Sequence, residues 1–136
     1  MLGVVPGTVR IGLAVCDPDR LIATPHMTVP AGKAATAEIA AQVTELGCVA
    51  VVVGLPRSLQ GRETDSTRMA RGLAAALTDA GLVVHLQDER LTSVQADRAL
   101  RAAGRNVKQS RDHKDQVAAS MLLQAWLDAD RTRNER

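Results

Sequence analysis

Residues 48–55 read Cys-Val-Ala-Val-Val-Val-Gly-Leu, an apolar run without a single charged side chain. The run does not alternate between apolar and polar residues, which is typical of a parallel strand covered on both faces of its sheet. Residues 34–46 before it and 63–80 after it carry apolar residues at helical spacing, and each segment is followed by a glycine, Gly47 and Gly81. This order predicts a central strand between two crossover helices.

Further strands and helices are expected on both sides of this unit. Residues 2–5 and 9–16 are short apolar runs joined by the turn Pro6-Gly7-Thr8, which indicates a β-hairpin. Because parallel crossovers are right-handed, the later strands should lie beside the first one. We therefore predict one α/β domain over residues 1–136, with a mixed five-stranded sheet covered by helices. Its first three strands are antiparallel, and about four helices flank it. The remaining elements are expected as strands over 21–29 and 82–86 and helices over 93–103 and 110–128.

Composition excludes several classes of protein. Aromatic residues make up 1% of the chain, with Trp126 alone, so modules that stack bases on aromatic side chains are excluded. No run approaches the roughly 18 apolar residues of a membrane span, and the first residues do not resemble a signal peptide. We expect a cytoplasmic protein without membrane contact, in which Cys16 and Cys48 are small reduced hydrophobes.

The charges are unevenly distributed along the chain. Residues 1–89 hold seven Lys/Arg and nine Asp/Glu, a net charge of −2, whereas residues 90–136 hold ten and six, a net charge of +4. The basic excess is either a surface that faces a polyanion or a solvated helix end. It is densest at Arg101, Arg105, Lys108, Arg111 and Lys114, and we predict that the last four, in a loop between the final two helices, contact phosphates.

Candidate site residues lie where two strands end and on the last helix. Ligands bind at the carboxyl ends of parallel strands, and Gly54-Leu55-Pro56 and Asp88-Glu89 occupy two such ends. At most one of the two adjacent carboxylates normally faces a site. Asp115 shares the apolar stripe of its helix, where a carboxylate is costly unless it is paired or binds a cation; the alternative is an interaction with the helix dipole. Strand-end and helix carboxylates at one sheet edge favour divalent metal ions that act on phosphodiesters.

Four segments make the sequence resemble the YqgF family, also called RuvX, whose members are pre-16S rRNA nucleases with a ribonuclease-H-like fold. The segments span nearly the whole chain in the family's order, and the last two together are quite specific. They are Arg10-Ile-Gly-Leu-Ala-Val-Cys-Asp-Pro18, Val52-Val-Gly-Leu-Pro56 with Gly61, Asp88-Glu-Arg-Leu-Thr-Ser93 and Asp115-Gln-Val-Ala-Ala119.

The resemblance implies a metal-dependent nuclease acting on structured nucleic acid. The implied role is 5′-end processing of pre-16S rRNA in ribosome biogenesis; the alternative is Holliday-junction resolution. Its cofactor would be Mg²⁺ or Mn²⁺, and its partners structured RNA or branched DNA, with the protein a monomer or weak homodimer. The residues carried over are Glu89, Asp115 and Asp88 as catalytic, Glu89 and Asp115 as metal ligands, Arg10 and Arg90 as phosphate-binding, and Gly54 and Pro56 as the substrate-proximal loop.

The chain departs from the family at one position. The family pattern begins with an Asp in the first strand, and this chain has Val5 there, followed by Pro6. If Val5 faces about Arg10 across the hairpin, Asp17 lies roughly 20 Å or more away at about 3.3 Å per residue, too far to replace the missing ligand. We therefore expect a protein that binds structured nucleic acid and cleaves it slowly or not at all. Two hypotheses stay open: the retained Glu89 and Asp115 favour a nuclease, whereas Val5 favours a catalytically impaired binding or ribosome-assembly protein.

Overall fold

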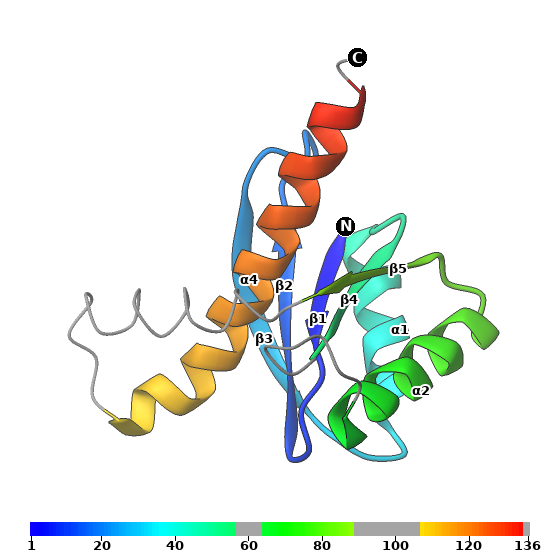
Figure 1. The fold of residues 1–136 in the computed structure, drawn as a ribbon, viewed down its shortest axis with the longest axis vertical. Helices are drawn as coiled ribbons and strands as arrows, with labels where there is room; N and C mark the ends of the chain where they lie inside the picture. The colour runs from blue at the N-terminus through cyan, green and yellow to red at the C-terminus, as the bar shows by residue number, and fades with distance from the viewer. Residues whose placement is uncertain (57–63, 89–106, 135–136) are drawn as a thin grey trace.

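The computed structural model describes residues 1–56, 64–88 and 107–134, which form one sheet with helices on both faces (Figure 1). Over these residues no helix combines the length and the apolarity needed to cross a membrane. The predicted helix over 93–103 lies outside the described residues. The strands are β1 Leu2–Val5, β2 Arg10–Cys16, β3 Ala23–Pro30, β4 Val51–Leu55 and β5 Val84–Asp88, and the helices are α1 Ala35–Leu46, α2 Asp65–Asp79 and α4 Val107–Asn134.

The sheet has the strand order β3-β2-β1-β4-β5. β1 pairs antiparallel with β2 and β2 with β3, whereas β4 runs parallel to both β1 and β5. The predicted mixed five-stranded α/β fold is therefore confirmed. The hairpin register is not the expected one: Val5 lies opposite Gly12, two residues beyond Arg10.

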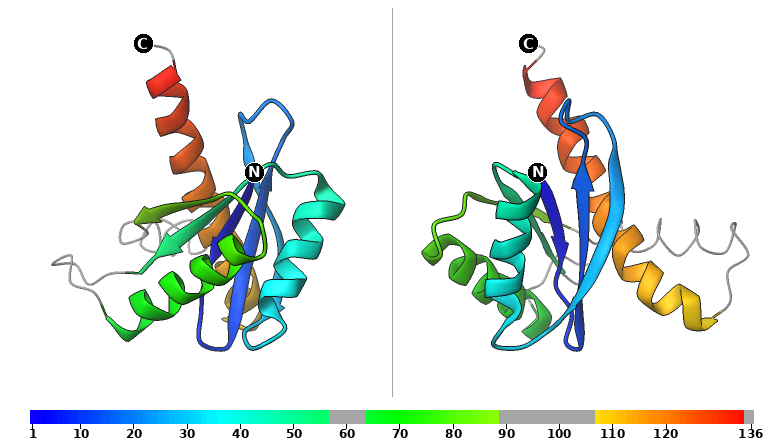
Figure 2. Two further views of the ribbon diagram at one scale, coloured as in Figure 1. Left: turned by 90° about the vertical axis from the view of Figure 1, so that its right-hand side faces the viewer. Right: turned by 180° about the vertical axis from the view of Figure 1, so that it is seen from behind.

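The two faces of the sheet are covered by different helices (Figure 2): α1 and α2 pack on one face and α4 crosses the other. The first face holds a core of large aliphatic side chains, among them Leu2, Val4, Leu13 and Ile39. The second core combines small strand residues with the large side chains of α4. Its buried members are Met1, Ala14, Ala50, Val52, Ala119, Leu122, Leu123, Trp126 and Leu127.

The helix ends follow the local sequence in part. Gly47 caps α1 with φ 67°, the left-handed conformation that glycine adopts without steric cost, as predicted. The predicted last helix over 110–128 starts three residues too late, because α4 begins at Val107 and takes in Lys108 as well as Arg111 and Lys114. Lysine and arginine are good helix formers, so a basic run does not by itself stop a helix.

Candidate functional site

Helix α4 lies directly against the backbone of β1 and β2. A Cβ atom added at Gly12 would lie 2.1 Å from the carbonyl oxygen of Asp115, and one added at Gly3 would lie 2.9 Å from the Cβ of Leu123. Contacts this short leave no room for a side chain at Gly3 or Gly12. The two glycines therefore let the helix approach the sheet closely. Gly12 of β2 is the point against which Asp115 of α4 packs.

Asp115 and Arg10 form an ion pair at this point of contact. The Nε of Arg10 donates a hydrogen bond to Oδ2 of Asp115 over 2.9 Å, and the two side chains are 36% and 33% exposed. Arg10 is the first residue of β2 and lies on the same face as Gly12, two residues away. The structure thus brings together two predicted site residues, and it compensates the Asp115 carboxylate with a guanidinium group.

Val5 lies beside this pair. It is opposite Gly12 in the hairpin, and its half-buried side chain packs against the core under α4. Asp17 is remote from it, because the amide of Cys16 bonds the carbonyl of Met1, at the other end of β1. The Asp17 carboxylate accepts the amides of Leu21 and Ile22 over 2.7 and 2.9 Å and thereby closes the β2–β3 turn.

Asp88, the last residue of β5, lies on the other face of the sheet. Side chains alternate along a strand. His85 packs against Trp126 of α4, with ring centroids 4.9 Å apart, whereas Val84 packs with the core under α1 and α2. Alternation therefore places Asp88 on the α1 and α2 face, away from Asp115. The structure does not bring these two carboxylates together, and Glu89 and Arg90 lie outside the described residues.

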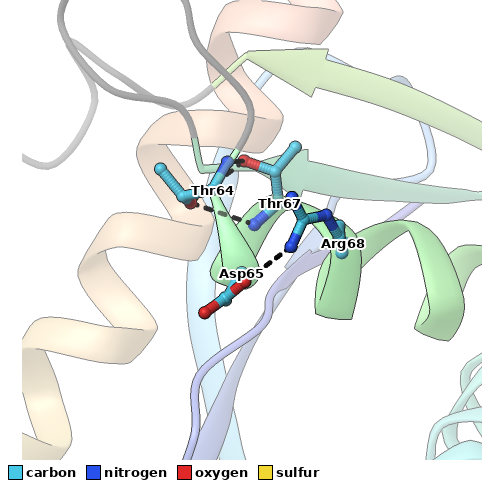
Figure 3. A network of polar contacts seen from close by, with 4 residues as sticks. All are labelled: Thr64, Asp65, Thr67 and Arg68. Atoms are coloured by element: carbon cyan, nitrogen blue, oxygen red, sulfur yellow. Dashed lines mark hydrogen bonds and ion pairs between the residues drawn. The ribbon is translucent and has the colours of Figure 1, made fainter.

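Two threonines that sequence reasoning missed cap the start of α2 (Figure 3), and one of them attaches the exit of β4 to this helix. Thr64 caps the helix by accepting the amide of Thr67 over 3.3 Å, and its own amide donates to the Thr67 hydroxyl over 3.0 Å. The Thr67 hydroxyl, fully buried, donates to the carbonyl of Pro56. The network fixes the chain after Gly54, which pairs with Gln87. The signal that would have predicted this cap is a threonine at the N-cap followed three positions later by a polar residue, here Thr67 where a capping box usually has Glu or Gln.

The predicted basic residues lie mainly at the start of α4. Lys114 is exposed and directly precedes Asp115, whereas Lys108 and Arg111 belong to earlier turns of the helix. Arg105 lies outside the described residues. The basic end of α4 therefore adjoins the Arg10–Asp115 pair along the chain.

The described residues do not fit a two-metal centre. Two divalent cations require several oxygen ligands. On the α4 face Asp115 is engaged by Arg10, and Val5 is aliphatic. No group of three or more His, Cys, Asp or Glu within 1–56, 64–88 and 107–134 could hold a metal ion. Of the carboxylates that the family resemblance implies, the described residues place Asp115 on this face and have Val5 at the position of the family's first Asp, while Glu89 lies outside them.

Comparison with solved structures defines the fold. Two structures of RuvC from Thermus thermophilus share the fold over 97% of this chain. The structure in complex with a Holliday junction substrate matches this chain with a TM-score of 0.58 and 18% sequence identity, and the match covers 96% of the RuvC chain. The other has a TM-score of 0.52, 21% identity and 97% covered. The chain thus has the ribonuclease-H-like fold of RuvC.

Sequence comparison then gives the family. The family model described as "RuvX: Holliday junction resolvase" matches residues 1–129, and the chain belongs to this family. A protein of Clavibacter michiganensis subsp. michiganensis is 49% identical over 134 residues, 96% of this chain and 83% of the relative. One of Mycolicibacterium paratuberculosis is 50% identical over 131 residues, 93% and 78% of the two chains. Both relatives carry the name "Putative pre-16S rRNA nuclease".

Proposed function

We propose that this RuvX-family protein binds the structured 5′ region of pre-16S rRNA and hydrolyses its phosphodiester backbone only slowly. The family and the names of its relatives support the nuclease class and the substrate. The observation that carries the slow rate is the position of Val5, opposite Gly12 and beneath the helix turn that presents Asp115.

The binding half of the proposal rests on the cations around the ion pair. Arg10 on β2 has a side chain that is 36% exposed. On α4, the exposed Lys114 directly precedes Asp115, and Lys108 and Arg111 come before it in the helix. Guanidinium and ammonium groups hold phosphate oxygens, and such contacts dominate the affinity for nucleic acid. Arg90 and Arg105 are proposed to extend this surface.

The catalytic half rests on the number of carboxylates. The cofactor of the family's reaction is proposed to be Mg²⁺ or Mn²⁺, with Glu89 as the partner of Asp115. The family resemblance implies a third carboxylate at the position of Val5. With an aliphatic side chain there, only Glu89 and Asp115 are left as proposed ligands. A divalent cation would then be held weakly, and the loss of transition-state charge stabilisation lowers the rate by orders of magnitude. Binding is retained because phosphate contacts do not need this carboxylate.

A binding and cleavage assay of the natural sequence tests the proposal. The substrates are an RNA stem that carries the 5′ cleavage region of pre-16S rRNA and a four-way DNA junction of the same length, each with and without Mn²⁺. We expect salt-dependent binding of the RNA at micromolar protein or below, and cleavage close to background. A tighter complex with the junction would favour the resolvase alternative, which the family description supports. Absence of binding to either substrate would refute the proposal, and fast Mn²⁺-dependent cleavage would refute its catalytic half.

A further inference from the structure

The two partners of the Arg10–Asp115 ion pair are held with different rigidity. Asp115 is fixed from several sides: its carbonyl oxygen touches the backbone of β2 at Gly12, and the amide of the next side chain, Gln116, donates to the Thr28 hydroxyl of β3 over 3.1 Å. Two turns further on, Leu122 and Leu123 are fully buried against the sheet. The Asp115 carboxylate cannot move far unless α4 leaves the sheet.

Arg10 is the movable partner. Its guanidinium sits at the end of a long flexible side chain at the first position of β2, where the backbone leaves the sheet for the turn. The bond to Asp115 uses Nε, and a guanidinium group carries five N–H donors in a planar fork. With 36% of its side chain exposed, Arg10 is accessible to a ligand in solvent.

An ion pair of this kind is easily exchanged. Pairs that are about one third exposed are screened by water and salt and contribute little to stability. A phosphodiester offers the same acceptor chemistry as a carboxylate, and arginine binds both through parallel N–H···O bonds. A phosphate that approaches along the basic start of α4 can therefore replace the Asp115 carboxylate as the acceptor for the Arg10 guanidinium.

We infer that Asp115 holds Arg10 as an internal substitute for phosphate, and that Arg10 exchanges this carboxylate for a backbone phosphate when nucleic acid binds. The inference rests on the proposed function, since it needs a nucleic-acid ligand at this edge. Asp115 is then a positioning residue for Arg10: it orders the guanidinium before binding and lowers the affinity for any competing anion. The exchange also leaves the Asp115 carboxylate without its guanidinium partner at the moment when substrate is present.

A double-mutant cycle tests the exchange. RNA affinity is measured by fluorescence anisotropy for the natural protein, Arg10→Gln, Asp115→Asn and the double variant, at several salt concentrations and without divalent metal. Asp115→Asn should tighten binding roughly threefold to tenfold, because Arg10 no longer has to leave the Asp115 carboxylate. In the Arg10→Gln background the same change should alter affinity by about twofold or less, through long-range charge alone.

Two controls separate the exchange from other effects. Asp128→Asn removes the same charge from an exposed position of α4, where the carboxylate accepts from Gln124, and should act equally with and without Arg10. Thermal unfolding, followed by the fluorescence of Trp126 between α4 and the sheet, verifies that each variant is folded. If Asp115→Asn changes affinity by the same factor in both backgrounds, the exchange is refuted while the proposed function stands. If the natural protein binds no RNA, the proposed function and this inference both fail.

Discussion

The two faces of the sheet are built from the same strands in opposite ways. Toward α1 and α2 the strands present Leu2, Val4, Ile11 and Leu13, which separate the helices from the sheet by a layer of large side chains. Toward α4 the same strands present Gly3, Gly12 and Ala14 where the helix crosses them, and most of the large side chains belong to the helix. One face is therefore an ordinary aliphatic core, and the other is a close contact between helix and strand backbones.

The difference explains why the candidate site lies on the α4 face. A helix held away by leucine and valine could not present a short carboxylate at the strand backbone. The Gly12 contact removes that layer, so that Asp115 reaches Arg10 over 2.9 Å. Small residues on a strand can thus mark where a sheet receives a functional side chain from a neighbouring helix.

Gly12→Ala should produce the largest loss of stability. The new methyl group would overlap a backbone carbonyl oxygen, which cannot rotate aside as a side chain can, so α4 must shift. Overpacking typically costs about 1–3 kcal/mol of unfolding free energy, and a clash with backbone atoms belongs at the upper end of that range. The same shift should separate Arg10 from Asp115 and weaken RNA binding. Urea denaturation measures the first effect and anisotropy the second.

The matched control removes one carbon from the other face. Ile11→Val, at the neighbouring position of β2, should cost only about 1 kcal/mol and leave RNA binding unchanged, because the aliphatic core tolerates a small cavity. If Gly12→Ala is no more destabilising than Ile11→Val, the two faces do not differ as described here.

Gly72→Ala should produce the smallest effect, with the opposite sign. Gly72 lies inside α2, and a Cβ atom added there meets no other atom within 4 Å. The substitution should raise the unfolding free energy by about 0.5–1 kcal/mol, because alanine loses less backbone entropy in a helix. A destabilised Gly72→Ala variant would show that α2 packs more tightly than the structure indicates.

Much of this architecture follows from the sequence alone, and the reasons for success and failure differ by region. The unbroken apolar run of β4 and the glycine after α1 specify their elements locally, so both could be predicted. Asp115 was recognisable as a costly carboxylate on an apolar stripe. Its pairing with Arg10 was not, because the two residues are 105 positions apart and meet only through packing at Gly12.

The predictions of where α4 starts and of how the β1–β2 hairpin pairs were wrong for a related reason. Basic residues suit a helix and a loop equally well, so their charge does not locate the boundary at Val107. The pairing of Val5 with Gly12 depends on the conformation of the turn over residues 6–9. A change in that turn shifts the register and so gives every residue of the strand a different partner. Catalytic roles for Glu89, Asp88 and Asp115 remain predictions.

The most direct test of the central claim compares the natural protein with Val5→Asp and Val5→Asn in one RNA-cleavage assay across a Mn²⁺ titration. Asp at this position adds a second carboxylate beside Asp115 on the α4 face, whereas Asn is of similar size and carries no charge. We predict that all three proteins bind the RNA, and that Mn²⁺-dependent cleavage by Val5→Asp exceeds that of the other two by about 100-fold or more. Equal and rapid cleavage by the Val5 protein would contradict the account, because the missing carboxylate would then not limit the reaction.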